Sequence, residues 1–197
     1  MAKRGLDVTL AVLGLLLLAP LILALVIVLK LTDSGPLLYG HRRVGFGGRE
    51  FRCWKFRTMV VNGDAVLEQY LRKHPAKAAL WYEQRKLVDD PRVTPLGAVL
   101  RKLSLDELPQ LLNVLTGEMS LVGPRPMMPD QQPMYSGEGY YRLRPGITGF
   151  WQTAGRNRTT FAARAWYDDR YERSLSFGSD LAILLRTVSV VLGRTGC

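Results

Sequence analysis

The chain has 197 residues, of which 47% are hydrophobic and 22% charged, and its formal net charge at neutral pH is +10. This length suits one domain with a sizeable core. Its two cysteines, Cys53 and Cys197, are too few for a disulfide framework and fit a reducing compartment. The positive charge suits anionic lipid headgroups or a polyanionic substrate. It would also suit nucleic acid, but zinc-finger, helix-turn-helix and RNA-binding sheet signatures are missing from the sequence, so we predict no nucleic-acid partner.

The N-terminal segment contains a long apolar run. From Val8 to Leu29 the sequence has 22 residues without a charge, which as a helix would be about 33 Å long, close to the hydrocarbon thickness of a bilayer. The run exceeds the apolar core of a typical signal peptide, and no small-residue cleavage site follows it. We therefore predict a membrane helix.

Two features favour a helix that enters and leaves through one leaflet over a helix that spans the bilayer. Pro20 lies in the middle of the run, where it removes a backbone hydrogen bond and predicts a kink or break. Basic residues lie before the run and after it, and the positive-inside bias draws both flanks to the cytoplasmic side. Residues 1–33 are therefore predicted to form a re-entrant helix broken near Pro20, although backbone groups freed at the break would need polar partners. A spanning helix is the alternative.

The following segments alternate short strands and helices. Leu37 to Met59 predicts a β-hairpin around Gly45, Gly47 and Gly48, and helices are predicted from Gly63 to Val88 and from Leu96 to Leu103. Near the C-terminus, Leu181 to Leu192 carries one charge and is too short to span a bilayer. It is either a core helix or a helix lying in the membrane interface.

The most informative stretch runs from Arg101 to Pro126. It sets the adjacent Asp106 and Glu107 between basic residues and a Gly-Pro-Arg-Pro turn that contains Arg125. Carboxylates can attack phosphorus or hold Mg²⁺, and arginines bind phosphate oxygens. The alternative is structural: Ser104 and Glu107 have the spacing of a capping box, and Arg125 would be a solvated residue of a rigid surface turn. Pro109 argues against that box and for a helix that begins nearer Asp106, where an anion is stabilised.

A second basic cluster follows from Arg142 to Arg158. It has four arginines, no acidic residue, several glycines and two aromatic residues. Such a loop can hold a diphosphate and stack a ring. Alternatively, Phe150 and Trp151 lie in the membrane interface.

Taken together, these residues resemble the bacterial sugar transferase family, the monotopic phosphoglycosyl transferases. The resemblance rests on motifs in order along nearly the whole chain: KRGLD at Lys3 to Asp7, the run broken by Pro20, KFRTM at Lys55 to Met59, DPRVTPLG at Asp90 to Gly97, SLDELPQLLNVLTGEMSLVGPRP at Ser104 to Pro126, and PGITGFWQTAGRN at Pro145 to Asn157. The chain departs from the family pattern at His41, where glutamine is more frequent, and at Ala19 before Pro20. Larger members have additional N-terminal spans, so we expect either a minimal member or part of a longer protein.

The resemblance implies an α+β, mostly helical monotopic protein, with residues 34–197 forming a catalytic domain on the cytoplasmic face of the bacterial inner membrane. This domain would contain interfacial helices and a short β-hairpin. The implied activity is transfer of hexose 1-phosphate from a UDP-hexose to polyprenol (undecaprenyl) phosphate, the first membrane step of exopolysaccharide, O-antigen or capsule synthesis. Residues Asn62 to Val88 resemble the branch that transfers galactose or glucose.

The resemblance also implies roles for individual residues. Asp106 would be the nucleophile that forms an aspartyl-phosphosugar intermediate and releases UMP, and Glu107, with Asp106, would hold Mg²⁺. Arg101 and Arg125 would bind phosphate. Contacts to the nucleotide or sugar would come from Lys55, Arg57, Gly146, Gln152 and Arg156.

Two rival hypotheses remain at this point. A non-catalytic, membrane-anchored scaffold that binds anionic lipids would keep the apolar run and the positive charge, but it would not need Asp106, Glu107 or Arg125. A polytopic transferase acting through one ternary complex would need many spans, and the sequence has one strong apolar run. The sequence leaves open which sugar and which polyprenol are used and whether the chain forms a homodimer.

Overall fold

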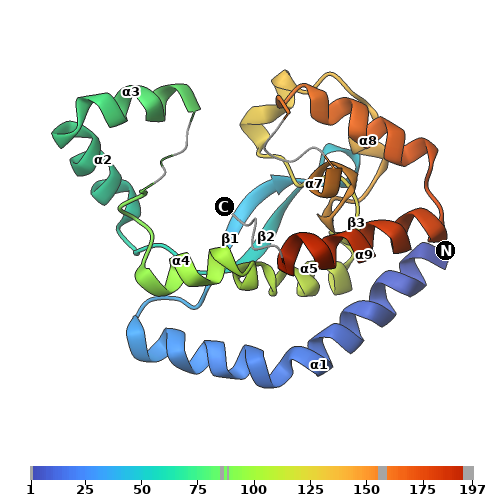
Figure 1. Ribbon diagram of the computed structural model, residues 1–197, viewed down its shortest axis with the longest axis horizontal. Helices are drawn as coiled ribbons and strands as arrows, with labels where there is room; N and C mark the ends of the chain where they lie inside the picture. Colours follow the sequence, from blue (N-terminus) through green and yellow to red (C-terminus); the bar gives the residue numbers. More distant parts are fainter. Residues whose placement is uncertain (1, 85–86, 88, 155–158, 193–197) are drawn as a thin grey trace.

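The computed structural model describes residues 2–84, 87, 89–154 and 159–192. The described part is mostly helical, as predicted, with two small two-stranded sheets (Figure 1). In chain order its elements are α1 (Ala2–Thr32), β1 (Leu38–Val44), η1 (Phe46–Gly48), β2 (Glu50–Phe56), α2 (Gly63–Lys73), α3 (Pro75–Gln84), α4 (Pro95–Lys102), η2 (Leu105–Glu107), α5 (Gln110–Thr116), β3 (Ser120–Val122), η3 (Pro129–Met134), α6 (Gly139–Arg142), β4 (Gly146–Thr148), α7 (Phe150–Ala154), α8 (Ala163–Arg173) and α9 (Phe177–Leu192).

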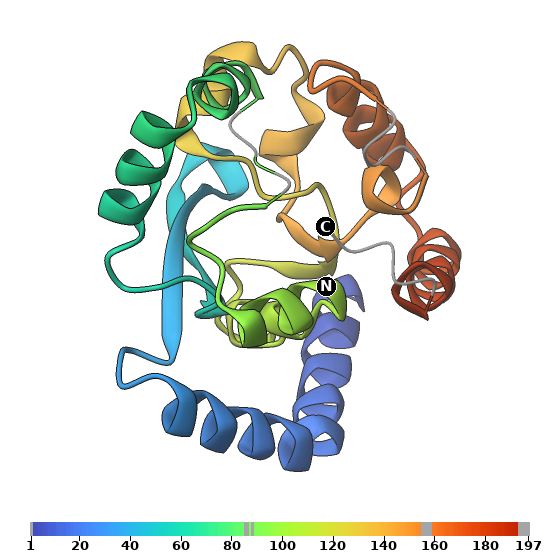
Figure 2. The ribbon, with the colours of Figure 1, turned by 60° about the vertical axis from the view of Figure 1, so that its left-hand side comes forward.

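Helix α1 continues through Pro20 without interruption, so the expected break is a bend. Figure 2 shows two arms of α1 that meet at a sharp turn midway along the helix. Proline lacks the N–H of the helical ladder and its ring crowds the preceding turn, which bends a helix when the flanking turns are strongly helical. Half of the twelve leucines of α1 are exposed, including Leu17 and Leu31, each 81% exposed. Among the described residues, α1 is the one helix long and apolar enough to cross a membrane.

The first turns of α1 are fixed to the rest of the molecule by polar contacts. The Lys3 ammonium lies 2.6 Å from an oxygen of Asp180 in α9, and the Arg4 guanidinium donates to two carbonyls at the end of α5. The buried Asp7 carboxylate accepts hydrogen bonds from the Ser120 hydroxyl at 2.8 Å and from the Leu121 backbone N–H at 3.0 Å. The KRGLD motif therefore docks the apolar helix onto α5, β3 and α9.

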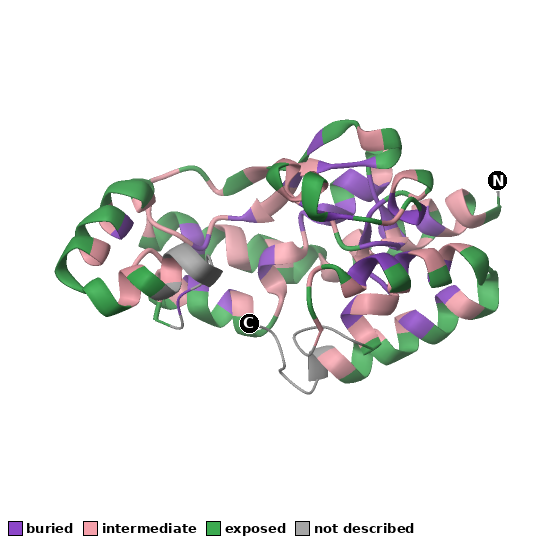
Figure 3. Ribbon diagram, turned by 90° about the horizontal axis from the view of Figure 1, so that it is seen from above, coloured by how far each residue is buried: buried purple, intermediate pink, exposed green. Residues whose placement is uncertain are grey.

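The predicted hairpin is confirmed as β1 and β2, which pair antiparallel from Leu38 opposite Phe56 to Val44 opposite Glu50. The turn between them uses Gly47 and Gly48 in left-handed conformations that favour glycine. Two of the buried side chains of β2, Phe51 and Cys53, pack against α5 and the docked arm of α1. Figure 3 shows buried residues concentrated in this part of the molecule, whereas α2 and α3 at the opposite end are mostly exposed.

The helices largely follow the sequence pattern, with two differences. The predicted helix from Gly63 to Val88 is divided into α2 and α3, because Pro75 disfavours a helical conformation at His74. Helix α9 has a buried side, as expected of a core helix, and an exposed apolar side; its placement in the membrane interface stays a prediction. Asp180 and Ile183 are buried against the domain, and an apolar outer face is exposed, formed by Phe177, Leu181, Leu185 and Val188.

Candidate active site

Asp106 and Glu107 lie in η2, a short 3-10 turn between α4 and α5. Ser104 before this turn adopts a left-handed conformation, and its side chain makes no capping hydrogen bond, so the capping-box interpretation is wrong. The α-helix begins only at Gln110 because Pro109 has no N–H to donate into the ladder. Asp106 and Glu107 therefore lie in the short turn directly before α5.

Strand β2 places Lys55 beside the dyad. Its ammonium lies 2.6 Å from Oε1 of Glu107 and 3.8 Å from Oδ2 of Asp106. The predicted site residues Lys55, Asp106 and Glu107 are therefore brought together from positions about fifty residues apart.

Asp106 is 7% exposed, and this burial raises the pKa of its carboxyl above the ordinary value for aspartate. The positive charges of Lys55 and Arg101 act in the opposite direction, and burial outweighs them. A carboxylate that has lost most of its water is less stabilised in its charged form than one in solution. Such a group is well suited to attack an electrophilic phosphorus.

Two arginines predicted to bind phosphate stand in different environments. Arg101 in α4 donates through Nε to the Thr58 hydroxyl at 2.8 Å, and its charge acts on Asp106. Arg125 between its two prolines is exposed, and its backbone carbonyl accepts a hydrogen bond from Nη2 of the buried Arg164. Both guanidinium groups can therefore reach a ligand from anchored backbones.

A further arginine, Arg43 in β1, is largely buried between these groups. Its Nη1 donates to the Pro126 carbonyl at 3.3 Å, and its Nη2 lies 3.0 Å from Nδ1 of His41. Burial, followed by the charges of Arg43 and Lys55, lowers the pKa of His41 to about 4. His41 is thus neutral at pH 7 and accepts the Arg43 hydrogen bond, a role that glutamine can also fill.

The remaining predicted contacts lie elsewhere or outside the described residues. Arg57 is directed at Asp33, 2.8 Å away, and lines a separate pocket. Gly146 lies in β4, packed tightly against the backbone of Gly123. Gln152 in α7 is buried, and neither side-chain amide atom has a hydrogen-bond partner among the described residues. Arg156 lies outside the described residues. Nucleotide or sugar contacts by these residues stay predictions.

Comparison of the whole sequence with known proteins shows the family of this chain. Residues 1–194 match the family described as bacterial sugar transferase. The chain belongs to this family. It is 50% identical to the exopolysaccharide production protein ExoY of Sinorhizobium fredii over 192 residues, which cover 96% of this chain and 85% of that protein. It is 45% identical to the undecaprenyl-phosphate galactose phosphotransferase of Salmonella typhimurium, covering 98% of this chain and 41% of the relative.

A third relative differs in the sugar that its name gives. The UDP-glucose:undecaprenyl-phosphate glucose-1-phosphate transferase of Escherichia coli is 38% identical, over 94% of this chain and 39% of its own length. The relatives of this bacterial sugar transferase thus include proteins named for galactose and for glucose.

Two arginines that contact the Gly-Pro-Arg-Pro turn, Arg43 and Arg164, carry no local signal in the sequence of this bacterial sugar transferase. Arg164 in α8 is 5% exposed and lies about 5 Å from the ring centres of Trp151 and Phe161. It is separated from its partner Arg125 by 39 residues. No local pattern marks such a contact, because it depends on how α8 packs against the Gly-Pro-Arg-Pro turn.

The donor set of this transferase fits Mg²⁺. Mg²⁺ is usually bound through one or two carboxylates together with waters and substrate phosphates. Asp106 and Glu107 supply two adjacent carboxylates, and among the described residues no group of three or more acidic, histidine or cysteine side chains converges. Asp106 and Glu107 are therefore the residues of this site that could contribute carboxylate ligands to such an ion.

Proposed function

We propose that this chain transfers hexose 1-phosphate, with galactose or glucose as the sugar, from a UDP-hexose to polyprenol (undecaprenyl) phosphate through a covalent aspartyl intermediate. The observation that carries the proposal is the buried Asp106 carboxylate with Lys55 at 3.8 Å and Glu107 beside it. The names of the Salmonella and Escherichia relatives support the substrate class. The product would be a polyprenol diphosphate sugar that begins exopolysaccharide, O-antigen or capsule synthesis.

The proposed first step forms a bond between an Asp106 oxygen and the hexose-bearing phosphorus of the donor. The bond from that phosphorus to the bridging oxygen breaks, and UMP leaves with the electron pair. In the second step a phosphate oxygen of the polyprenol phosphate attacks the same phosphorus. The acyl phosphate bond then breaks, and the Asp106 carboxylate is restored.

The surrounding residues would bind and orient the charged groups. The Lys55 ammonium lies 3.8 Å from Asp106, and the charge of Arg101 also acts on this carboxyl. The exposed Arg125 can bind phosphate oxygens bidentately. Glu107, with Asp106, would hold Mg²⁺. Bound there, the metal would neutralise charge on the diphosphate and help UMP to leave.

We further propose that α1 is re-entrant and holds the domain on the cytoplasmic face of the inner membrane. Its bend and its exposed leucines support this arrangement, as do basic residues near both ends, Lys3 and Arg4 at one and Lys30 at the other. The exposed apolar face of α9 would lie in the interface, and the basic flanks would attract anionic lipids. This placement lets a soluble nucleotide sugar and a lipid phosphate reach one site.

The test is intact-mass measurement of the purified protein with Mg²⁺ and UDP-galactose or UDP-glucose, without acceptor. We expect an added hexose phosphate and released UMP for wild type, neither for Asp106→Asn, and normal adduct formation for the control Asp64→Asn, whose carboxylate is exposed on α2. A chelator should suppress the adduct. Absence of adduct and UMP with every UDP-sugar would contradict the covalent mechanism, and turnover with acceptor would then separate a ternary-complex transferase from a non-catalytic scaffold.

A further inference from the structure

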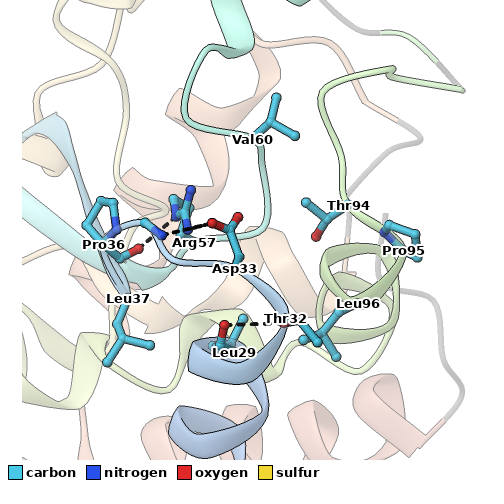
Figure 4. A pocket seen from close by; sticks show the side chains of 11 residues that line it. Leu29, Thr32, Asp33, Pro36, Leu37, Arg57, Val60, Thr94, Pro95 and Leu96 are labelled. Carbon is cyan, nitrogen blue, oxygen red and sulfur yellow. Dashed lines mark hydrogen bonds and ion pairs between the residues drawn. The ribbon is translucent and has the colours of Figure 1, made fainter.

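A pocket of about 530 Å³ lies between the end of α1, the turn into β1 and the start of α4 (Figure 4). This volume is within the range of small-molecule sites. Leucines from three segments, Leu29, Leu37 and Leu96, form apolar walls, and Arg57, Asp33 and Thr94 contribute polar groups. The pocket thus combines an apolar lining with a guanidinium group.

Arg57 is the distinctive member of this lining. Its side chain is 11% exposed, with Nη2 at 2.8 Å from an Asp33 oxygen and Nε donating to the Pro36 carbonyl at 2.7 Å. The remaining terminal nitrogen, Nη1, is buried and has no hydrogen-bond partner among the described residues. A Cβ on Gly35 would lie 2.6 Å from this nitrogen, so the glycine allows the close approach. A buried N–H of a charged group without an acceptor is costly, and an anionic ligand would supply that acceptor.

The pocket adjoins the membrane helix on one side. Leu29 belongs to the last turns of α1, and Leu31 in the same turns is 81% exposed. An apolar chain entering from this end would therefore meet apolar walls before it met Arg57. A purely water-soluble anion would not need such an approach.

On its other side the pocket is connected to the dyad. Leu29 packs in one apolar cluster with Leu105 and Leu108, which flank Asp106 and Glu107. Thr58 links the polar parts: its carbonyl accepts from the Thr94 N–H at 3.0 Å, and its hydroxyl accepts from Arg101 at 2.8 Å. Lys55 lies near the end of β2, and Arg57 directly follows that strand, two residues further along the chain.

We infer that this pocket receives the phosphate end of the polyprenol phosphate acceptor, an inference that rests on the proposed function. Its phosphate oxygen accepts the free Nη1–H of Arg57, and the first isoprene units lie against Leu29, Leu37 and Leu96. Asp33 then shares the guanidinium with the incoming phosphate. From this position the phosphate is delivered past Lys55 to the phosphosugar on Asp106.

The first experiment separates the two half-reactions. The acceptor role and the nucleotide or sugar contact implied for Arg57 by the resemblance give opposite results here. For Arg57→Ala the acceptor role predicts adduct formation from UDP-hexose at the wild-type rate, but a KM for polyprenol phosphate raised about 10- to 100-fold, as for loss of a charged hydrogen bond. Arg57→Lys should recover part of this loss. The matched control is Arg92→Ala, which removes a comparable arginine–aspartate pair, 2.7 Å long and 15% exposed on the arginine side, that does not line the pocket.

A second variant guards against misfolding of Arg57→Ala. Val60 lines the pocket, so Val60→Trp should fill the space while leaving the Arg57–Asp33 pair intact. We expect the same selective rise in acceptor KM. If either variant slows donor and acceptor steps equally, or leaves the acceptor KM at the wild-type value, the inference is overturned.

The third experiment measures binding directly. A photoreactive polyprenyl phosphate in nanodiscs should label peptides that contain residues 29–37 or 94–96, and excess polyprenyl phosphate should compete. Equal competition by phosphatidylglycerol would assign the pocket to bulk phospholipid, and competition by inorganic phosphate alone would assign it to a free anion; each would overturn the inference. Labelling of the pocket in a protein that forms no adduct would instead support a lipid-phosphate site and reject the covalent function. A normal adduct with labelling outside the pocket would support the covalent function and reject the lipid-phosphate site.

Discussion

Two buried carboxylates, Asp7 in the first turns of α1 and Asp106 in η2, meet very different surroundings. Asp7 is 4% exposed and receives hydrogen bonds from the Ser120 hydroxyl and the Leu121 backbone. Asp106 is 7% exposed, its nearest cation is 3.8 Å away, and burial raises its pKa. A buried carboxylate with strong donors at both oxygens holds segments together. A buried carboxylate whose nearest cation is more distant, such as that of Asp106, can react with a substrate, but its burial lowers the stability of the folded protein.

The largest expected effect comes from Asp106→Asn. Removal of the nucleophile should lower the rate of UMP release by at least about 10³-fold. Because the substitution also removes a poorly solvated buried charge, the unfolding temperature should stay unchanged or rise. Turnover and thermal unfolding in the same detergent would test both parts. A marked drop in unfolding temperature would place Asp106 with Asp7 among structural carboxylates.

Replacing Lys55 with methionine should have the next largest effect. Its ammonium pairs with Glu107 and lowers the Asp106 pKa, so its loss should reduce turnover by about 10- to 100-fold and raise that pKa further. If the ionised carboxylate is the attacking form, activity falls as pH drops through this pKa. The acid limb of the pH–rate profile should therefore move to higher pH.

Lys55→Arg is the matched control because it keeps the positive charge. Its acid limb should lie closer to that of wild type than the limb of Lys55→Met. Coincident profiles for wild type and Lys55→Met would show that Lys55 does not set the protonation of the nucleophile.

The contrast between the two carboxylates also shows what the sequence could predict. Asp106 and Glu107 could be located from the sequence because they are adjacent carboxylates between basic residues and a Gly-Pro-Arg-Pro turn, a composition typical of a phosphate and metal site. The hairpin was predictable from its glycine turn, and α4 from its apolar pattern. The partnership of Asp7 with Ser120 was not, because it joins residues 113 positions apart and is fixed only when α1 docks.

The same limit explains the behaviour of Pro20 and Arg57. A proline predicts lost helical hydrogen bonds, but whether the helix breaks or bends depends on packing along both arms. Arg57 has the same charge as Lys55 and lies two residues away, yet Asp33 and the Pro36 carbonyl draw it into a different pocket. The family resemblance implied nucleotide or sugar contacts for both residues, but tertiary contacts place Lys55 at the dyad and Arg57 in the separate pocket.

Asp7→Ala should act on stability and much less on chemistry. It leaves the Leu121 N–H without its acceptor and removes one of two acceptors of the Ser120 hydroxyl, which also lies 2.9 Å from the Val122 carbonyl, so the free energy of unfolding should fall by about 1–3 kcal/mol. For a chain of this size that corresponds to a loss of about 2–4 °C in unfolding temperature for each kcal/mol. Turnover per folded molecule should remain near that of wild type.

The control for this variant is Asp64→Ala, which removes an exposed carboxylate from α2 and should change stability by less than about 0.5 kcal/mol. Equal unfolding temperatures for Asp7→Ala and Asp64→Ala would contradict a docking role for the KRGLD motif.

The last comparison concerns Asp168, a buried carboxylate whose surroundings are intermediate between those of Asp7 and Asp106. Burial is the main cause that raises its pKa to about 7, while Arg164 and the Tyr135 hydroxyl, which donates at 3.0 Å, act to lower it. Between the ordinary aspartate pKa near 3.8 and about 7, the folded protein therefore binds more protons at this site than the unfolded chain. The contribution of Asp168 to the free energy of unfolding should accordingly decrease as pH rises through that window, by up to about 1.4 kcal/mol per pH unit.

Asp168→Asn should remove this dependence, so its unfolding temperature relative to wild type should increase from pH 5 to pH 7. Asp64→Asn should leave the wild-type pH dependence unchanged. A constant difference between wild type and Asp168→Asn over the window would mean that Arg164 keeps Asp168 ionised at pH 5. In that case Asp168 would belong with Asp7, as a carboxylate stabilised by its partners, and Arg164 would hold the Arg125 backbone as one half of a buried ion pair.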